Sequence, residues 1–566
     1  MFLISFTTTN LDIIIESAKY NQYIFRLNFP NLKTATFRSI MRPFSLTLCI
    51  FVSYMDTNVH RGTRIAKNTL MLYVRMLVLM LVGLYTSRVV LEALGEDDMG
   101  VYNVVGGVVA MFTIISGALN SAVSRFITFE MGKGEKAQLN KVYSTAVTIQ
   151  LILAAIVVLL AEPIGLWFIN NEMNIDPASR PQAEWVLHFS LAAFVVNLMS
   201  VPQMASITAH EKMSAYAYIG ILDALLRLCT ALLIMHSSGD RLIQYSALMM
   251  VTVILVRCAY GIYCRRNFEE CRYRPVFDRP LIREMFAFAG WNFVGVTSGV
   301  LRDQGGNILV NLFSGAAGTA VNAARGMAVQ LNGAVQGFVT NFMTAVNPQI
   351  TKSYASGDHG YMFSLVRKSS RMSFYLLLML VLPLVLNTDV VVGLWLKEVP
   401  AHTVLFVQLF LIFALSESLS NPMITAMLAT GRIRNYQLVV GGIQLLNIPV
   451  SYIFLRFGAI PEVTVMVAIA LSQVCLWARL IMLSRATGFP VRAFVADVYL
   501  KCIFIVLPCA ACVPALFELV KPAGLFGAVA SVAICVLWAA FVIYIIGMSS
   551  DERSMVNGLL KKGGRK

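Results

Sequence analysis

The sequence predicts an all-α protein that crosses a membrane about fourteen times. Hydrophobic residues make up 58% of the 566-residue chain and charged residues only 13%, with a mean hydropathy of +0.71. Soluble proteins carry about 25% charged residues. The apolar residues gather in runs close to the ~20 residues that an α-helix needs to span a bilayer. The net charge of +15 does not indicate a nucleic-acid partner, because the basic residues lie in short connections between these runs.

The first 54 residues do not follow the pattern of the rest. Their apolar run at 44–54 is too short to span a bilayer and lacks a small-residue cleavage site. A basic lead and the first long apolar run follow Met55, so we expect Met55 to be the initiator and 1–54 to be an extension of the gene model. The alternative is a loosely ordered cytoplasmic leader.

The expected spans are 69–93, 100–128, 142–166, 184–208, 214–236, 242–264, 284–313, 319–345, 365–389, 402–427, 434–455, 461–483, 497–517 and 523–547.

The connections between these spans differ in charge. Lysine and arginine gather in the lead after Met55, in every second connection and in the C-terminal tail. The alternate connections hold only the basic residues Arg180, Arg241, Lys397, Arg456 and Lys521. Basic connections tend to stay in the cytoplasm. The asymmetry therefore predicts a multi-pass protein with both termini cytoplasmic.

Patterns in the first half of the chain recur in the second half. They pair Pro202, Ala209, Lys212 and Tyr216 with Pro422, Ala429, Arg432 and Tyr436, Asn103 and Gly107 with Asn322 and Gly326, Ile127 and Thr128 with Ile350 and Thr351, and Gly165 and Trp167 with Gly393 and Trp395. The repeat holds six spans, an even number, so both copies share one orientation. The expected domains are an N-lobe at 55–264, a basic cytoplasmic linker at 265–283, a C-lobe at 284–483, two added helices at 484–547 and a basic cytoplasmic tail at 548–566.

The seventh and eighth spans form a hairpin whose polar groups a lipid environment disfavours. Arg302, Asp303 and Arg325 are each placed near the middle of the bilayer by a rise of ~1.5 Å per residue. One stripe of the second helix carries Asn322, Arg325, Asn332, Gln336 and Thr340. Ionisable residues at this depth cost ~2.5 kcal/mol or more each. The pattern predicts a watery cavity or a bound partner, and the alternative is an Arg–Asp pair that joins two helices.

No motif for catalysis or cofactor binding accompanies this pattern. The sequence contains no GxxxxGK[ST], GxSxG or HExxH. Cys509 and Cys512 form a CxxC inside an apolar run, which indicates two buried small side chains. We expect no catalytic residue, metal or cofactor. A glycan-processing enzyme would need a catalytic loop, and the longest predicted outer connection, 162–183, has no cluster of carboxylates or histidines.

Two stretches and the number of spans carry a family resemblance. LGEDDMGVYNVVGG lies between spans 1 and 2, and PQMASITAHEKMSAYAY follows span 4. With twelve spans plus two, the chain resembles bacterial polysaccharide flippases, in the superfamily that also contains multidrug and toxin extrusion antiporters and the lipid II flippase. The resemblance covers about residues 60–548. It implies two six-helix lobes around a central cavity that is lined by helices 1, 2, 7 and 8 and opens alternately to each side of the membrane.

The resemblance also implies a substrate, which is an undecaprenyl-pyrophosphate-linked oligosaccharide moved from the cytoplasmic to the periplasmic leaflet of the bacterial inner membrane. Arginine provides bidentate donors to phosphate, and amide side chains can hydrogen bond to sugars. The implied substrate-contacting residues are Arg302, Arg325, Asp303, Asn322, Asn332, Gln336, Arg75, Arg88, Asn103 and Arg125. The arginines of spans 1 and 2 have an alternative role, because they lie near span ends and can extend to the interface.

Other expectations concern ion coupling, partners and rival functions. Asp303 and Glu417 are candidates for ion coupling, although Glu417 can instead hydrogen bond to neighbouring polar groups at Ser416, Ser420 or Asn421. Expected partners are the lipid-linked oligosaccharide, membrane lipids and the polysaccharide polymerase or export machinery. An ion-coupled multidrug antiporter of the same superfamily is the alternative function. Its cavity would be acidic and aromatic, whereas the polar residues expected here hold more arginine than carboxylate.

Overall fold

The structure, a computed structural model, describes residues 59–110, 112–171, 173, 180–276, 278–315, 318–395, 399–511, 524–548 and 553. The predicted extension at 1–54 lies outside the described residues. All regular elements within the described ranges are helices, which confirms the all-α class. Among them, nine helices are long and apolar enough to cross a membrane, or ten if one bent pair counts as a single span. The protein is therefore a multi-pass membrane protein, and the count of fourteen spans stays a prediction.

The N-terminal helices pack around one hydrophobic core. They are α4 (Val59–Ala110), α5 (Thr113–Lys133), α6 (Lys136–Asn171), α7 (Arg180–Ala209), α8 (Met213–Met235) and α9 (Arg241–Asn267). The core between them includes fully buried Ile127, Ile149 and Leu187. Spans 1 and 2 were predicted as separate helices at 69–93 and 100–128, and α4 breaks between them at Gly95, where φ is 82°. Glycine adopts this backbone conformation without a steric penalty. Span 2 runs from the last part of α4 into α5.

The C-terminal helices surround a second core. They are α10 (Arg279–Phe313), α11 (Gly318–Ala355), α12 (His359–Leu386), α13 (Thr388–Trp395), α14 (Thr403–Ser418), α15 (Asn421–Ala429), α16 (Arg434–Leu445), α17 (Asn447–Arg456), α18 (Val463–Thr487), α19 (Val491–Phe494), η5 (Val495–Leu500), α20 (Lys501–Ala511), α22 (Gly524–Val542) and η6 (Ile543–Gly547). Phe342, Tyr375 and Phe406 lie at the centre of this second core. The short η3 (Glu269–Cys271) before these helices packs against α6 and α9 and belongs to the first core. We call the two groups the N-lobe and the C-lobe, and their exact residue boundaries stay a prediction.

Two spans predicted as single helices are interrupted. The span at 402–427 consists of α14 and α15, which meet at an angle of 40°. The span at 434–455 is divided into α16 and α17 only at Leu446, whose backbone stays in the helical region, so the two helices together still form one span. Each second helix has a proline in its first turn, Pro422 and Pro449. A proline has no N–H to donate to the preceding turn, so the helix ends or bends there.

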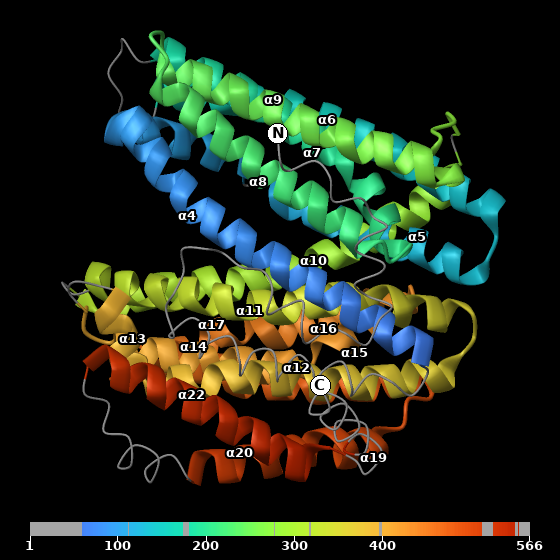
Figure 1. The fold of residues 1–566 in the computed structure, drawn as a ribbon, viewed down its shortest axis with the longest axis vertical. Helices are drawn as coiled ribbons and strands as arrows, with labels where there is room; N and C mark the ends of the chain where they lie inside the picture. The colour runs from blue at the N-terminus through green and yellow to red at the C-terminus, as the bar shows by residue number, and fades with distance from the viewer. Residues whose placement is uncertain are drawn as a thin grey trace, which may run out of the picture.

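The two lobes converge at one end of the molecule. Figure 1 shows α4 to α9 inclined to the remaining helices, with α5 at the converging side. α5 packs against both α10 and α11, and α4 also contacts α11. We call this the basic end, because the helix ends there adjoin the connections rich in lysine and arginine. These helix ends are Lys133, Ala209, Asn267, Ala355, Ala429 and Thr487.

Candidate functional site

The polar hairpin forms two long helices, α10 and α11, as predicted. Asp278 caps α10 by accepting a hydrogen bond from the backbone N–H of Leu281 at 3.0 Å. Its carboxylate also pairs with Lys141 of α6, which joins the start of the hairpin to the N-lobe. The side-chain bond from Lys141 and the backbone bond from Leu281 lower the pKa of Asp278. Asp278 therefore marks the start of α10, and the polar residues of this helix lie further along it, in the C-lobe.

Arg302 and Asp303 form an ion pair within one helix. The Nε of Arg302 lies 2.8 Å from Oδ1 of Asp303, and Nη2 lies 3.2 Å from Oδ2. The Arg302 side chain is only 14% exposed and lies 4.9 Å from the ring centre of Phe413 on α14. The Asp303 side chain is 56% exposed. This pair therefore does not join two helices, and its accessible member is the carboxylate.

Arg325 lies inside the C-lobe and is 4% exposed. It donates hydrogen bonds to the Asn307 side chain at 2.6 Å, the Thr464 hydroxyl at 2.9 Å and the Asp303 carbonyl at 3.4 Å. Its guanidinium also lies 5.2 Å from the ring centre of Phe410. These partners come from α10, α14 and α18, and all of them are uncharged groups. In this conformation the protein itself holds Arg325, so contact with a ligand would need these helices to separate.

Two amide side chains on α11 have hydrogen-bonding capacity left over. The Oδ1 atoms of Asn322 and Asn332 are buried and accept no hydrogen bond within the described part of the chain, and the Thr297 hydroxyl on α10 has no partner there either. A buried polar atom left unpaired costs about 1–3 kcal/mol. These groups suit a ligand that carries hydroxyls. Gln336 is half-buried on the same helix. The sequence analysis did not select Thr297, because an isolated threonine in an apolar helix gives little signal.

The predicted N-lobe residues do not join this cluster. Arg75 stacks over the Tyr216 ring at 4.4 Å, and Arg88 is exposed. The Asn103 side chain lies outside the described part of the chain. Arg125 is at the basic end, where Nη2 donates to the Ala429 carbonyl at 3.1 Å. The structure thus brings together Arg302, Asp303 and Arg325, whereas Arg75 and Arg125 have other partners.

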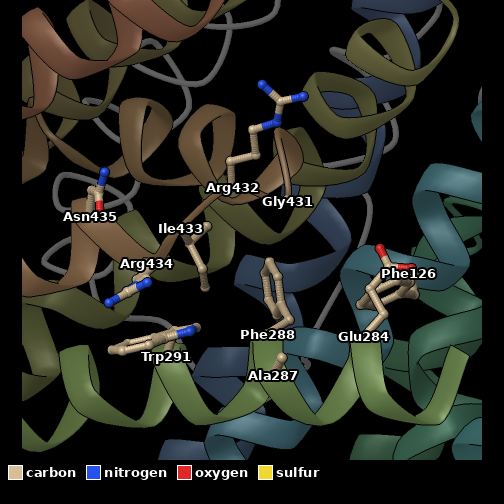
Figure 2. A pocket seen from close by; sticks show the side chains of 10 residues that line it. All are labelled: Phe126, Glu284, Ala287, Phe288, Trp291, Gly431, Arg432, Ile433, Arg434 and Asn435. Atoms are coloured by element: carbon tan, nitrogen blue, oxygen red, sulfur yellow. The ribbon is translucent and has the colours of Figure 1, made fainter. Parts of the chain in front are cut away.

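A cavity of about 460 Å³ also lies at the basic end. Phe126 of α5, Phe288 and Trp291 of α10, and residues 431–435 at the start of α16 line it, as Figure 2 shows. Arg434 packs over the Trp291 ring at 5.4 Å. No member of the α10–α11 polar cluster lines this cavity, so the two features are separate.

Glu417, a candidate for ion coupling, pairs with an arginine that the sequence analysis did not select. Its Oε1 lies 3.7 Å from Nη1 of Arg479, and the two side chains are 19% and 3% exposed. The hydroxyl of Ser416, proposed above as an alternative partner, bonds to Ser472 instead. Arg479 was overlooked because it lies near the basic end of its span, where arginines usually serve topology.

Solved structures share the fold of this chain. A MATE transporter, crystallised in complex with MaD3S, aligns with a TM-score of 0.66 and 13% identity over 77% of this chain and 99% of that chain. A second, described as a MOP superfamily transporter from Pyrococcus furiosus with a binding pocket of reversed polarity, aligns with a TM-score of 0.64 and 12% identity over 78% of this chain and 98% of that chain. At such identities the likeness shows that this chain shares the fold of these two proteins, and no more.

Comparison with protein families identifies the family of the chain. Residues 65–354 match the model of the family described as polysaccharide biosynthesis protein, and the chain belongs to this family. It is also 22% identical over 297 residues to EpsK, an uncharacterized membrane protein of Bacillus subtilis. That alignment covers 52% of this chain and 58% of EpsK. The chain thus spans less than two thirds of the curated relative that it matches.

Proposed function

We propose that this protein flips an undecaprenyl-pyrophosphate-linked oligosaccharide from the cytoplasmic to the periplasmic leaflet of the bacterial inner membrane, with both termini in the cytoplasm. Its family belongs to polysaccharide biosynthesis and its fold is that of a transporter. The product would serve surface polysaccharide or lipopolysaccharide synthesis. The polymerase or export machinery would act on the translocated product.

The charge around the Arg302–Asp303 pair, Arg325 and the Glu417–Arg479 pair is the observation that carries this proposal. Three arginines, Arg302, Arg325 and Arg479, lie among two carboxylates, Asp303 and Glu417. Arg325 contributes the excess cation, because its hydrogen-bond acceptors are uncharged. A buried charge needs a counter-charge to offset its desolvation. A pyrophosphate would supply one, and guanidinium binds phosphate oxygens through paired donors.

The free amide oxygens support the sugar part of the substrate. Asn322 and Asn332 lie on the same helix as Arg325, and their buried Oδ1 atoms can accept hydrogen bonds from hydroxyl groups. An ion-coupled drug antiporter would bind organic cations and would need the opposite charge in this region. The proposed mechanism is alternating access, in which the lobes move relative to each other while the lipid tail stays in the bilayer.

The test is a head-group flipping assay in proteoliposomes with a fluorescent polyprenyl-pyrophosphate oligosaccharide. We expect wild type to flip it and Arg302→Gln and Arg325→Gln to lower the initial rate at least about tenfold, equal to about 1.4 kcal/mol. Arg227→Gln is the matched control, because Arg227 pairs with Asp223 within α8, outside the hairpin. Rates are compared per folded, inserted protein. Failure of wild type to flip the lipid, together with ion-driven dye efflux, would support the antiporter instead.

A further inference from the structure

A tight turn of the N-lobe reaches across to the C-lobe at the basic end. Glu211, between α7 and α8, has φ of 58° and a side chain only 5% exposed. Its carboxylate accepts hydrogen bonds from Lys352 at 2.8 Å and Gln349 at 3.2 Å, both on α11. Its backbone carbonyl accepts one from Asn68 of α4 at 3.2 Å. A non-glycine residue in the left-handed region is disfavoured unless its surroundings hold it there. We call this set of interactions the first gate contact.

A corresponding turn of the C-lobe reaches back to the N-lobe. Gly431, between α15 and α16, has φ of 75°. Arg125 of α5 donates to the Ala429 carbonyl in this turn, and its guanidinium stacks at 4.6 Å and 4.4 Å on Phe126 and Phe129. A Cβ at Gly431 would come within 2.7 Å of Arg125 Nη2, and the left-handed backbone at this position also favours glycine. We call this the second gate contact. Figure 2 shows its turn beside Phe126 and Phe288.

The internal repeat relates the two gate contacts. Position 211 in the first turn corresponds to position 431 in the second at the offset of the Pro202 and Pro422 pattern. The pattern of Ile127 and Ile350 likewise relates the end of α5 to the end of α11. In each contact, the tight turn of one lobe therefore docks on the end of a long helix of the other lobe, and a cationic side chain donates to the turn. Ring contacts between Phe129 and Tyr354 lie at the same end.

We propose that the two gate contacts act as a paired gate that holds the basic end closed and must break each time that end opens. Glu211 and Arg125 are the positioning residues of this gate. The role rests on the alternating access proposed above, although the gate itself can be tested without substrate. In Figure 1 the lobes diverge from the basic end, as expected if this end is the closed one. The gate contacts use charged donors, which form the stronger class of hydrogen bond.

The test measures the distance between the lobes at the basic end in lipid nanodiscs. Spin labels on ketone-bearing amino acids at Lys212 and Ser356, both exposed, avoid the ten native cysteines. We expect a short distance to dominate in the otherwise wild-type protein. Glu211→Gln and Arg125→Met should each raise the ratio of long to short distances about tenfold, equal to about 1.4 kcal/mol.

A charge exchange separates a gate from a general loss of structure. Glu211→Lys combined with Lys352→Glu should restore the short distance, because the ion pair re-forms with its charges reversed. Asp223→Asn, which breaks an ion pair inside the N-lobe, should leave the distances unchanged. If Glu211→Gln does not fold, Lys352→Gln tests the same contact, because the Lys352 side chain is the more exposed of the two. The proposal would be overturned if neither Glu211→Gln nor Arg125→Met changed the distances between the spin labels. It would also be overturned if the charge exchange did not restore the short distance.

The outcome is independent of the flipping assay. The distance measurement requires no substrate. If the variants open as expected but the wild type flips no lipid, the gate proposal stands and the proposed substrate is wrong. If the wild type flips the lipid but the Glu211→Gln and Arg125→Met variants show unaltered distances, the proposed substrate stands and the gate proposal is wrong.

Discussion

The two lobes share a helical plan but place their ionisable side chains differently. The C-lobe buries Arg325 and Arg479 at 4% and 2% exposure within its helices. In the N-lobe, the Asp223 and Arg227 pair within α8 stays 30% and 40% exposed. Burying a charge is expensive unless a partner compensates it. The difference indicates that the C-lobe, more than the N-lobe, has been specialised for charge inside the membrane, and it is there that we place the site.

Arg479→Met should have the largest effect on stability, because it leaves the Glu417 carboxylate without its ion-pair partner in the C-lobe. Breaking a buried pair from one side costs about 3–5 kcal/mol. We expect a clear fall in the thermal unfolding midpoint in detergent. Glu417→Leu combined with Arg479→Met should recover most of the loss, since no charge is then left unpaired.

The matched control for that prediction is Asp223→Asn in the N-lobe. Its pair with Arg227 is of the i, i+4 type and partly exposed, so its loss should cost no more than about 0.5 kcal/mol. Equal effects of Arg479→Met and Asp223→Asn would remove the contrast between the lobes.

Arg325→Gln should have a smaller effect. Glutamine can replace at most part of the hydrogen bonding to Asn307, Thr464 and the Asp303 carbonyl. Leaving such buried groups unpaired costs about 1–3 kcal/mol. Thermal unfolding of the variant, with and without the polyprenyl-pyrophosphate lipid, measures this. A midpoint equal to that of wild type would show that these three bonds do not hold Arg325 in solution.

Asp278→Asn should have the smallest effect, confined to a contact outside the bilayer. Lys141 and the Leu281 N–H lower the pKa of Asp278 below its unfolded value of about 3.9. The contact therefore stabilises the fold above that unfolded value and is lost as the pH falls through the lower folded-state value. The difference in unfolding midpoint between wild type and variant should shrink from about pH 6 to about pH 3. A constant difference over this range would contradict the assignment.

The sequence predicted the elements better than their breaks. Apolar runs predicted the helices, because helices satisfy every backbone group within one segment of chain. The break of α4 at Gly95 falls between the spans predicted at 69–93 and 100–128, but the division of α14 from α15 was not predicted, although Pro422 marks that place. Glycine and proline allow such interruptions, but packing against neighbouring helices decides whether one occurs.

The sequence by itself determined that this protein is a helical membrane protein with polar residues inside one hairpin. Hydropathy and the position of charged residues are properties of a single segment, so a stretch of about 20 residues is enough to predict a membrane-spanning helix. Only the tertiary structure decided which groups meet. Thr464 binds Arg325 across 139 positions of sequence, and Lys352 reaches Glu211 across 141. Such contacts depend on how separate helices pack against each other, and a local sequence pattern does not predict that packing.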